Sequence, residues 1–113
     1  MSQAILRIER DRNASGEIVR VVGELDLTNA DVLGSALLDT GGETVLLDLT
    51  DVTFIDSAGI RAIDQAHSSY AGEGRALLIV APPESRVAWT FRIAGFEQHH
   101  LLESVDAAPS DAD

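Results

Sequence analysis

The stretch from Asp48 to Ile60 constrains the fold of this chain more than any other. It joins an apolar run, residues 44–49, through an acidic loop to a pattern of helical spacing that begins at Ser57. The run is too short for a typical helix and nearly all apolar, as expected of a strand covered on at least one face. A strand that leads directly into an amphipathic helix is half of a strand-helix-strand unit. We therefore expect residues 44–49 to form a central strand of a sheet.

The rest of the chain alternates between strand and helix patterns in the same way. Residues 4–8 and 18–22 read as two strands joined by a turn at residues 13–16. A helix is predicted from Ala30 to the glycines at 41–42, preceded by a Thr-x-x-acid capping box at residues 28–31. Further helices are predicted from Ser57 to the glycines at 72 and 74 and from Glu84 to Ala94. The remaining strands are expected at residues 76–81 and 101–102.

This order predicts a single α/β domain with a mixed, mostly parallel sheet and helices mainly on one face. The length of 113 residues fits one such domain. We expect the domain to occupy residues 1–103. Residues 104–113 are acidic and rich in small side chains, and we expect them to form a disordered tail.

The charge and composition narrow the classes of function. The net charge is −11, and all eight basic residues are arginine, which disfavours direct nucleic-acid binding. Acidity of this kind promotes solubility or steers the protein toward a basic patch on a partner. No apolar run approaches the roughly 18 residues of a membrane span, and the N-terminus lacks a signal-peptide pattern. The chain has no cysteine. Together these features predict a cytoplasmic protein without membrane insertion.

Acidic side chains follow two of the predicted strands. Glu24 and Asp26 follow the second strand, and Asp56 stands beside Ser57 after the third. If the two strands are parallel neighbours, both loops emerge at one sheet edge and Asp26 approaches Asp56 and Ser57. A phosphate on Ser57 would meet free N–H groups of a helix N-terminus, and Arg61 at i+4 would either pair with it or remain solvated. The alternative is that Ser57 or Asp56 simply caps the helix.

Two other chemistries are weaker readings of the same residues. Asp26, Asp51 and Asp56 are potential Mg²⁺ or Ca²⁺ ligands, but their spacing matches no metal motif, and we predict no metal and no cofactor. A serine hydrolase would use Ser57 as nucleophile and a histidine (His67, His99 or His100) as base. The nucleophile elbow needs a glycine two residues before the serine, where this chain has Ile55. Trp89 and Ile93 lie off the main apolar stripe of the third predicted helix. Two alternatives stand for them, a contact with the core or a contact with a partner.

Two segments resemble one known family, the STAS domain, and specifically the bacterial anti-sigma factor antagonists. Residues 23–26, Gly-Glu-Leu-Asp, are similar to the family signature after the second strand. Residues 48–59, Asp-Leu-Thr-Asp-Val-Thr-Phe-Ile-Asp-Ser-Ala-Gly, are similar to its phosphorylation-site segment. The likeness covers residues 4 to 103.

The resemblance implies partner switching in transcription regulation and stress response, with the protein itself no enzyme. The antagonist binds an anti-sigma factor that has a GHKL-type kinase domain and so releases the sigma factor. Phosphorylation at the position of Ser57, with ATP and Mg²⁺, ends binding, and a PP2C-like phosphatase restores it. The implied partner-binding residues are Glu24, Asp26, Thr28, Asp56, Ser57, Ala58, Gly59 and Arg61.

Two of these positions depart from the family pattern. Ala58 and Arg61 stand where many antagonists have small residues, often serine and glycine. The resemblance also leaves open a STAS binding module without a phosphorylation cycle, in a lipid-transport ABC system or a stressosome. Lipid-transport modules commonly have threonine at the position of Ser57, which favours the antagonist reading.

Overall fold

A computed structural model describes residues 5–96 and 101–109 of the chain. The sheet has five strands in the order β1-β2-β3-β4-β5, with β1 antiparallel to β2 and the other neighbours parallel. The predicted α/β class, with a mixed and mostly parallel sheet, is confirmed. The strands are Leu6–Asn13 (β1), Gly16–Leu25 (β2), Thr44–Ile55 (β3), Ala76–Val80 (β4) and Leu101–Leu102 (β5), and the helices are Ala30–Asp39 (α1), Ser57–Gly72 (α2), Arg86–Ile93 (α3) and the 3₁₀ turn Val105–Ala107 (η1).

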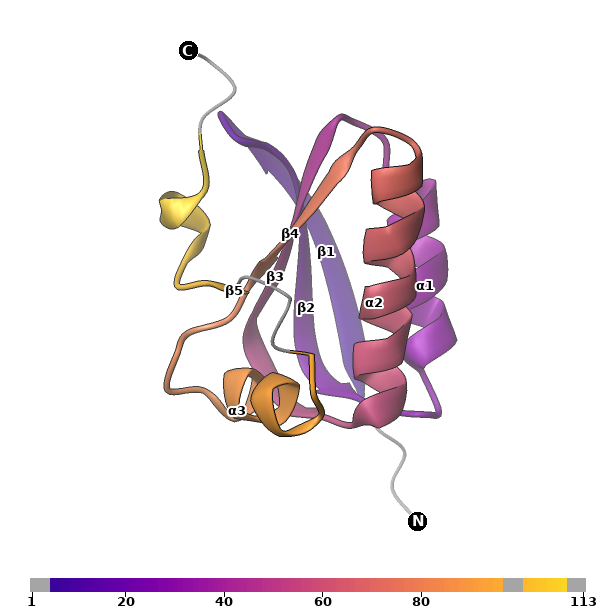
Figure 1. The fold of residues 1–113 in the computed structure, drawn as a ribbon, viewed down its shortest axis with the longest axis vertical. Coiled ribbons are helices and arrows are strands. Elements are labelled where there is room, and N and C mark those ends of the chain that lie inside the picture. The colour runs from indigo at the N-terminus through magenta and orange to yellow at the C-terminus, as the bar shows by residue number, and fades with distance from the viewer. Residues whose placement is uncertain (1–4, 97–100, 110–113) are drawn as a thin grey trace.

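Helices α1 and α2 lie side by side on one face of the sheet (Figure 1). Their apolar stripes are buried against alternate residues of the strands, as the helical and strand periodicities require. Helix α3 packs on the same core through Val87, Ala88 and Phe91, near the end where α2 begins. As predicted, β3 is the central strand. No helix in the described part of the chain has both the length and the hydropathy that a bilayer crossing needs.

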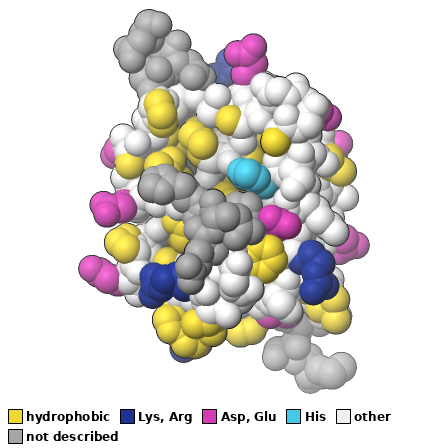
Figure 2. All heavy atoms as spheres, viewed as in Figure 1, with side chains coloured by type: hydrophobic (Ala, Val, Ile, Leu, Met, Phe, Trp, Pro, Cys, Tyr) yellow, Lys and Arg dark blue, Asp and Glu magenta, His cyan; other side chains and the backbone are white. Residues whose placement is uncertain are grey.

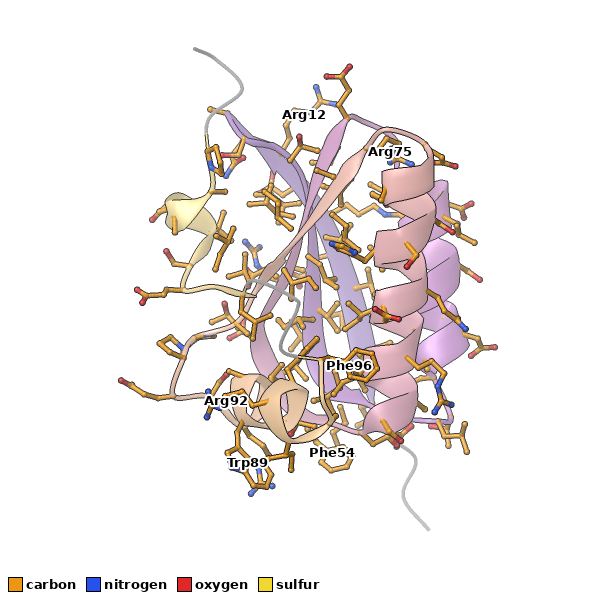
Figure 3. All side chains as sticks on the ribbon, viewed as in Figure 1. Arg12, Phe54, Arg75, Trp89, Arg92 and Phe96 are labelled. Atoms are coloured by element: carbon orange, nitrogen blue, oxygen red, sulfur yellow. The ribbon has the colours of Figure 1, made fainter. Side chains whose placement is uncertain are left out.

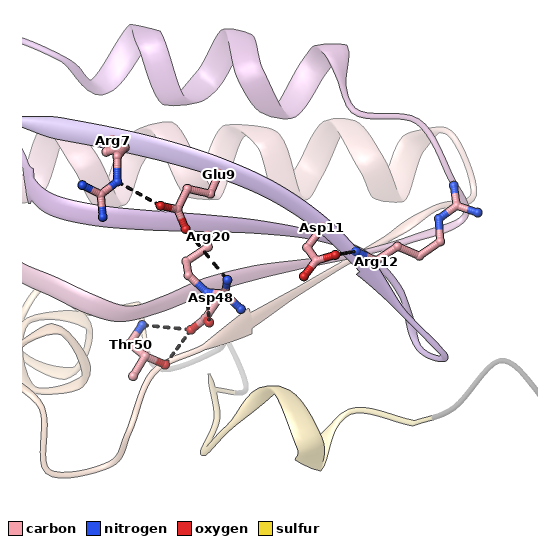
Figure 4. A network of polar contacts seen from close by, with 7 residues as sticks. All are labelled: Arg7, Glu9, Asp11, Arg12, Arg20, Asp48 and Thr50. Atoms are coloured by element: carbon pink, nitrogen blue, oxygen red, sulfur yellow. Dashed lines mark hydrogen bonds and ion pairs between the residues drawn. The ribbon is translucent and has the colours of Figure 1, made fainter.

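The opposite face of the sheet carries a row of charged side chains (Figure 4). Arg20 lies 3.3 Å from Asp48 and 3.9 Å from Glu9, and Glu9 also pairs with Arg7 at 2.9 Å. Asp48 is only 4% exposed, and it also accepts hydrogen bonds from the N–H and hydroxyl of Thr50. A buried carboxylate is costly unless it is paired, and this row supplies the partners.

The C-terminal segment covers an apolar part of that same face. Ile18, Leu46 and Val80 form a small buried cluster, against which Val105 and Ala108 pack. Residues 104–109, the start of the segment expected to be disordered, thus have a defined place in the fold through η1. Positions 110–113 lie outside the described residues.

Two local expectations are corrected by the structure. Strand β3 continues past Leu49 to Ile55, because Val52 and Ile55 are also buried and the segment pairs with β2 as far as Leu25. The predicted capping box at residues 28–31 is wrong. Helix α1 has Asn29 at its N-cap position with no side-chain cap, because the Thr28 hydroxyl donates to Asp26 instead.

Candidate functional site

The two acidic loops meet at the carboxyl edge of the sheet, as the sequence predicts. Strands β2 and β3 are parallel neighbours, with Leu25 opposite Ile55 at their last paired position. After β2 the chain turns into α1, and after β3 it turns into α2. The Asp56 N–H donates to the Leu25 carbonyl at 3.2 Å, which extends the pairing one step into the loop.

Asp56 holds the two loops together through both oxygens of its carboxylate. Oδ1 accepts from the Gly59 N–H at 3.0 Å and caps α2. Oδ2 accepts from the Leu27 N–H at 3.3 Å, in the loop after β2. Of the two candidate caps, Asp56 therefore takes this role and leaves the Ser57 hydroxyl unused for capping.

Ser57 is the first residue of α2 and is exposed. Within the part of the chain that the structure describes, its hydroxyl makes no hydrogen bond and lies free at the surface. The N–H groups of Ser57 and Ala58 lie in the first turn of α2, where no carbonyl of a preceding helical turn accepts from them. They are therefore available to an anion at this helix end. The position combines an accessible nucleophilic oxygen with a backbone that favours negative charge.

The first loop is organised by its own side chains. Asp26 Oδ1 accepts from the N–H of Thr28 at 2.9 Å and from its hydroxyl at 2.6 Å. Asn29, 8% exposed, accepts from the Asp26 N–H at 3.0 Å and donates to the Glu24 carbonyl at 2.9 Å. The Leu27 N–H joins this loop to Asp56, but the Asp26 carboxylate is bound within its own loop. The approach of Asp26 to Ser57 stays a prediction.

Gly59, one of the implied partner-binding residues, lies beneath the surface of the site. It is buried, and a Cβ at this position would lie 2.8 Å from Leu25 Cγ and 2.9 Å from Ile55 Cγ1. The missing side chain lets α2 pack closely against the ends of β2 and β3. Gly59 therefore affects the site by fixing the position of α2 on the sheet.

A groove between α1 and α2 begins beside Ser57, and the sequence analysis did not find it. It has a volume of about 460 Å³. Small side chains form much of its lining, including Ala58, while Leu27, Asp31 and Arg61 stand along it. Leu27 is 78% exposed, and Arg61 is exposed as well. No sequence motif marks this groove, because it depends on how the two helices sit together.

The geometry argues against the hydrolase reading. His67 lies ten residues after Ser57 on the same helix, a rise of about 15 Å, which is beyond the reach of a general base. His99 and His100 lie outside the described residues. Among the residues that the structure describes, no group of three or more His, Asp or Glu side chains is arranged to hold a metal ion.

The STAS domain family model matches residues 7–108, and the chain belongs to this family. An anti-sigma factor antagonist from Mycobacterium paratuberculosis has the same fold, with a TM-score of 0.76, 20% identity and coverage of 90% of this chain and 89% of that one. The Bacillus cell fate determinant SpoIIAA in its phosphorylated form gives a TM-score of 0.63 at 14% identity, covering 90% and 93%.

The fold also occurs in a transporter. The murine anion transporter Slc26a9 matches with a TM-score of 0.72 and 23% identity, covering 87% of this chain and 18% of that one. No curated protein was found to match the chain. The fold is thus common to antagonists and to a domain of a transporter.

Proposed function

We propose that this protein is an anti-sigma factor antagonist that is switched off by phosphorylation of Ser57. The observation that carries the proposal is the exposed, uncommitted Ser57 hydroxyl at the start of α2, beside a loop that Asp56 ties to it. The likeness to an anti-sigma factor antagonist over 90% of the chain supports this choice of partner. The phosphorylated form known for SpoIIAA supports the choice of switch.

The physical effect of the phosphate follows from the site. It adds about 1.5 to 2 negative charges and three acceptor oxygens. The free N–H groups of α2 stabilise it locally, so the fold tolerates the modification. Next to Asp26 and Asp56 the added charge raises the negative potential of the surface, and a partner that fits the hydroxyl is repelled. The switch therefore acts on binding.

In this proposal Ser57 is a substrate and the protein is no enzyme. The partner is an anti-sigma factor with a GHKL-type kinase domain, which supplies ATP and Mg²⁺, and a PP2C-like phosphatase reverses the reaction. Glu24, Asp26, Thr28 and Arg61 belong to the docking surface, together with Ala58 in the groove between α1 and α2.

The test is to incubate the purified protein with candidate anti-sigma kinases and ATP-Mg²⁺ and to locate the phosphate by mass spectrometry. Binding is then compared for the wild type, Ser57→Ala and Ser57→Asp. We expect Ser57→Ala to bind and Ser57→Asp to bind at least tenfold more weakly, an estimate of about 1.4 kcal/mol or more. Ser68→Asp, at another exposed serine of α2, controls for the added charge.

Binding that is equally strong for Ser57→Asp, or phosphate found only elsewhere, would contradict the switch. Stable binding without any modification would instead favour a STAS binding module without a phosphorylation cycle, of a lipid-transport ABC system or a stressosome.

A further inference from the structure

The arginines of this chain fall into two groups. Five of them have acceptors nearby, and these are Arg7, Arg10, Arg12, Arg20 and Arg75. Within the described residues, no ion pair or hydrogen bond is made by the guanidinium groups of the other three, Arg61, Arg86 and Arg92. The chain has 19 acidic residues against eight basic ones, so carboxylates are plentiful. Arg86 and Arg92 both lie on the short helix α3.

Arg86 and Arg92 stand on either side of Trp89 on the outer face of α3. The three residues are spaced at i, i+3 and i+6, so they form a continuous ridge. With Pro83, Glu84 and Ser85 they line a hollow of about 380 Å³. Trp89 is 50% exposed. We call the ridge Arg86, Trp89 and Arg92, with this hollow, the α3 patch.

The fold does not require a tryptophan at this position. The inner face of α3 is already buried through Val87, Ala88 and Phe91. Ser85 caps the helix by accepting from the Ala88 N–H at 3.2 Å. An exposed indole between two arginines therefore adds apolar surface and positive charge without serving the core.

The patch lies at the end of the molecule where α2 begins. Trp89, Arg92 and Phe54 are gathered there, and Arg12 lies at the opposite end (Figure 3). Phe54 is 40% exposed and Ile93, four residues after Trp89 on α3, is 62% exposed, so further apolar surface is open to solvent. In the space-filling view, hydrophobic side chains gather along the lower edge with a basic side chain beside them (Figure 2).

We propose that the α3 patch binds an acidic segment of a partner protein, with an aromatic or other apolar residue of that segment seated against Trp89. Tryptophan and arginine are the residue types most often found at binding hot spots. The guanidinium groups of Arg86 and Arg92 complement carboxylates and suit bidentate contacts. A second copy of this chain is disfavoured as the occupant, because each copy has a net charge of −11. This inference goes beyond the proposed function and does not depend on Ser57.

A peptide-display selection on the whole protein tests the proposal. A library of random 12-residue peptides is selected against the wild type, and the enriched peptides are synthesised. Binding is followed by the fluorescence of Trp89, the only tryptophan of the chain. Nonspecific attraction to an acidic protein enriches basic peptides, so an acidic consensus with an aromatic residue is a discriminating result.

Variants then assign the binding to the patch. We expect the double variant Arg86→Ala, Arg92→Ala to weaken binding about tenfold, since exposed charge pairs each contribute a few-fold. Trp89→Ala, followed by calorimetry, is expected to lose about thirtyfold or more. Arg12→Ala, which removes an exposed arginine at the far end, and Ser57→Asp are expected to leave the affinity within twofold. Circular dichroism verifies that each variant is folded.

Three results would overturn the inference. They are an enriched consensus that is basic or absent, an affinity that the α3 variants do not change, and sedimentation showing a dimer that Trp89→Ala dissociates. The last result would assign the patch to a second copy of the chain.

Discussion

Gly59 and Gly34 are both helical glycines, yet their surroundings differ sharply. A Cβ on Gly59 would meet Leu25 and Ile55 at 2.8 and 2.9 Å, whereas nothing lies within 4 Å of a Cβ on Gly34. Gly59→Ala is therefore expected to destabilise the fold by about 1–3 kcal/mol through overpacking. Gly34→Ala is expected to stabilise it by about 0.5–1 kcal/mol through helix propensity. Urea unfolding of the two variants measures both changes.

The pair controls for propensity, because the same substitution is made in both helices. Equal shifts in the unfolding midpoint would show that α2 does not pack as closely on β2 and β3 as the structure indicates.

Tyr70 gives the protein a defined response to alkaline pH. Burial raises the pKa of its phenol above the ordinary value of 10.0, although the Arg75 cation, 4.0 Å from the ring centre, opposes this. The folded state thus holds the proton more tightly than the unfolded chain. The resulting stability is fully present below pH 10 and is lost as the pH rises through the raised pKa. We expect the free energy of unfolding to fall above about pH 10.

The composition makes this response easy to assign. The chain has one tyrosine, no cysteine and no lysine, so no other side chain titrates in this range. Tyr70→Phe removes the phenol that donates to the Leu37 carbonyl at 2.5 Å. Its stability is expected to be about 1 kcal/mol lower at pH 8 and independent of pH between 9 and 11. A similar alkaline loss in Tyr70→Phe would contradict the assignment.

Single residues also show which parts of the site can be predicted from the sequence. The position of Ser57 at a helix start follows from local pattern, because a strand run, an acid and a helical stripe come in order. Asn29 and Gly59 could not be assigned in the same way. Asn29 joins two backbone groups of its own loop, and Gly59 contacts Leu25, a residue 34 positions away in the chain. The Gly59 contact follows only from the packing of α2 on β2 and β3, and the Asn29 contacts follow only from the conformation of its loop.

At the scale of elements, Asp56 links the start of α2 to the loop that leads into α1. Asp56→Ala removes the acceptor of both the Gly59 and Leu27 N–H groups. We expect a loss of stability of about 1–2 kcal/mol, the usual cost of a lost N-cap. Hydrogen exchange of these two amides is expected to speed up by tenfold or more, about 1.4 kcal/mol of local opening.

Asp51→Ala is the matched control for this change. Asp51 is an exposed acid of β3, five residues before Asp56. It is expected to leave both amides and the overall stability unchanged within about 0.5 kcal/mol. If Asp56→Ala altered Gly59 exchange but not that of Leu27, the link between the two loops would be refuted while the cap remained.

The elements themselves were predicted unevenly, for a physical reason. The strand and helix patterns located α2, β4 and α3 because each has a clear apolar period and a glycine or proline boundary. The end of β3 was missed because residues 50–55 place two exposed side chains, an acid and threonines among them, before each buried one, a pattern without the alternation of a strand. The cap of α1 was missed because Thr28 and Asp26 bond each other instead.

At the scale of the whole molecule, the main imbalance is the net charge of −11. Self-repulsion of this kind destabilises the compact state and is screened by salt. The screening length falls from about 30 Å at 0.01 M to about 8 Å at 0.15 M ionic strength, so repulsion across a small domain is largely removed. We expect the melting temperature to rise by roughly 4–8 °C over this range, equivalent to about 1 kcal/mol.

Salt also weakens the attraction between oppositely charged side chains. The sign of the change in melting temperature shows whether repulsion or attraction dominates. The pairs Arg7 with Glu9 and Arg20 with Glu9 are partly exposed and lose strength on screening, whereas Arg20 with Asp48 is more protected because the Asp48 side chain is 6% exposed. Exposed pairs contribute at most about 1 kcal/mol each. A fall in melting temperature with NaCl and equally with KCl would therefore mean that the charged row on the open face of the sheet outweighs the repulsion. A rise would show that the acidity is a cost to stability, which the folded domain tolerates.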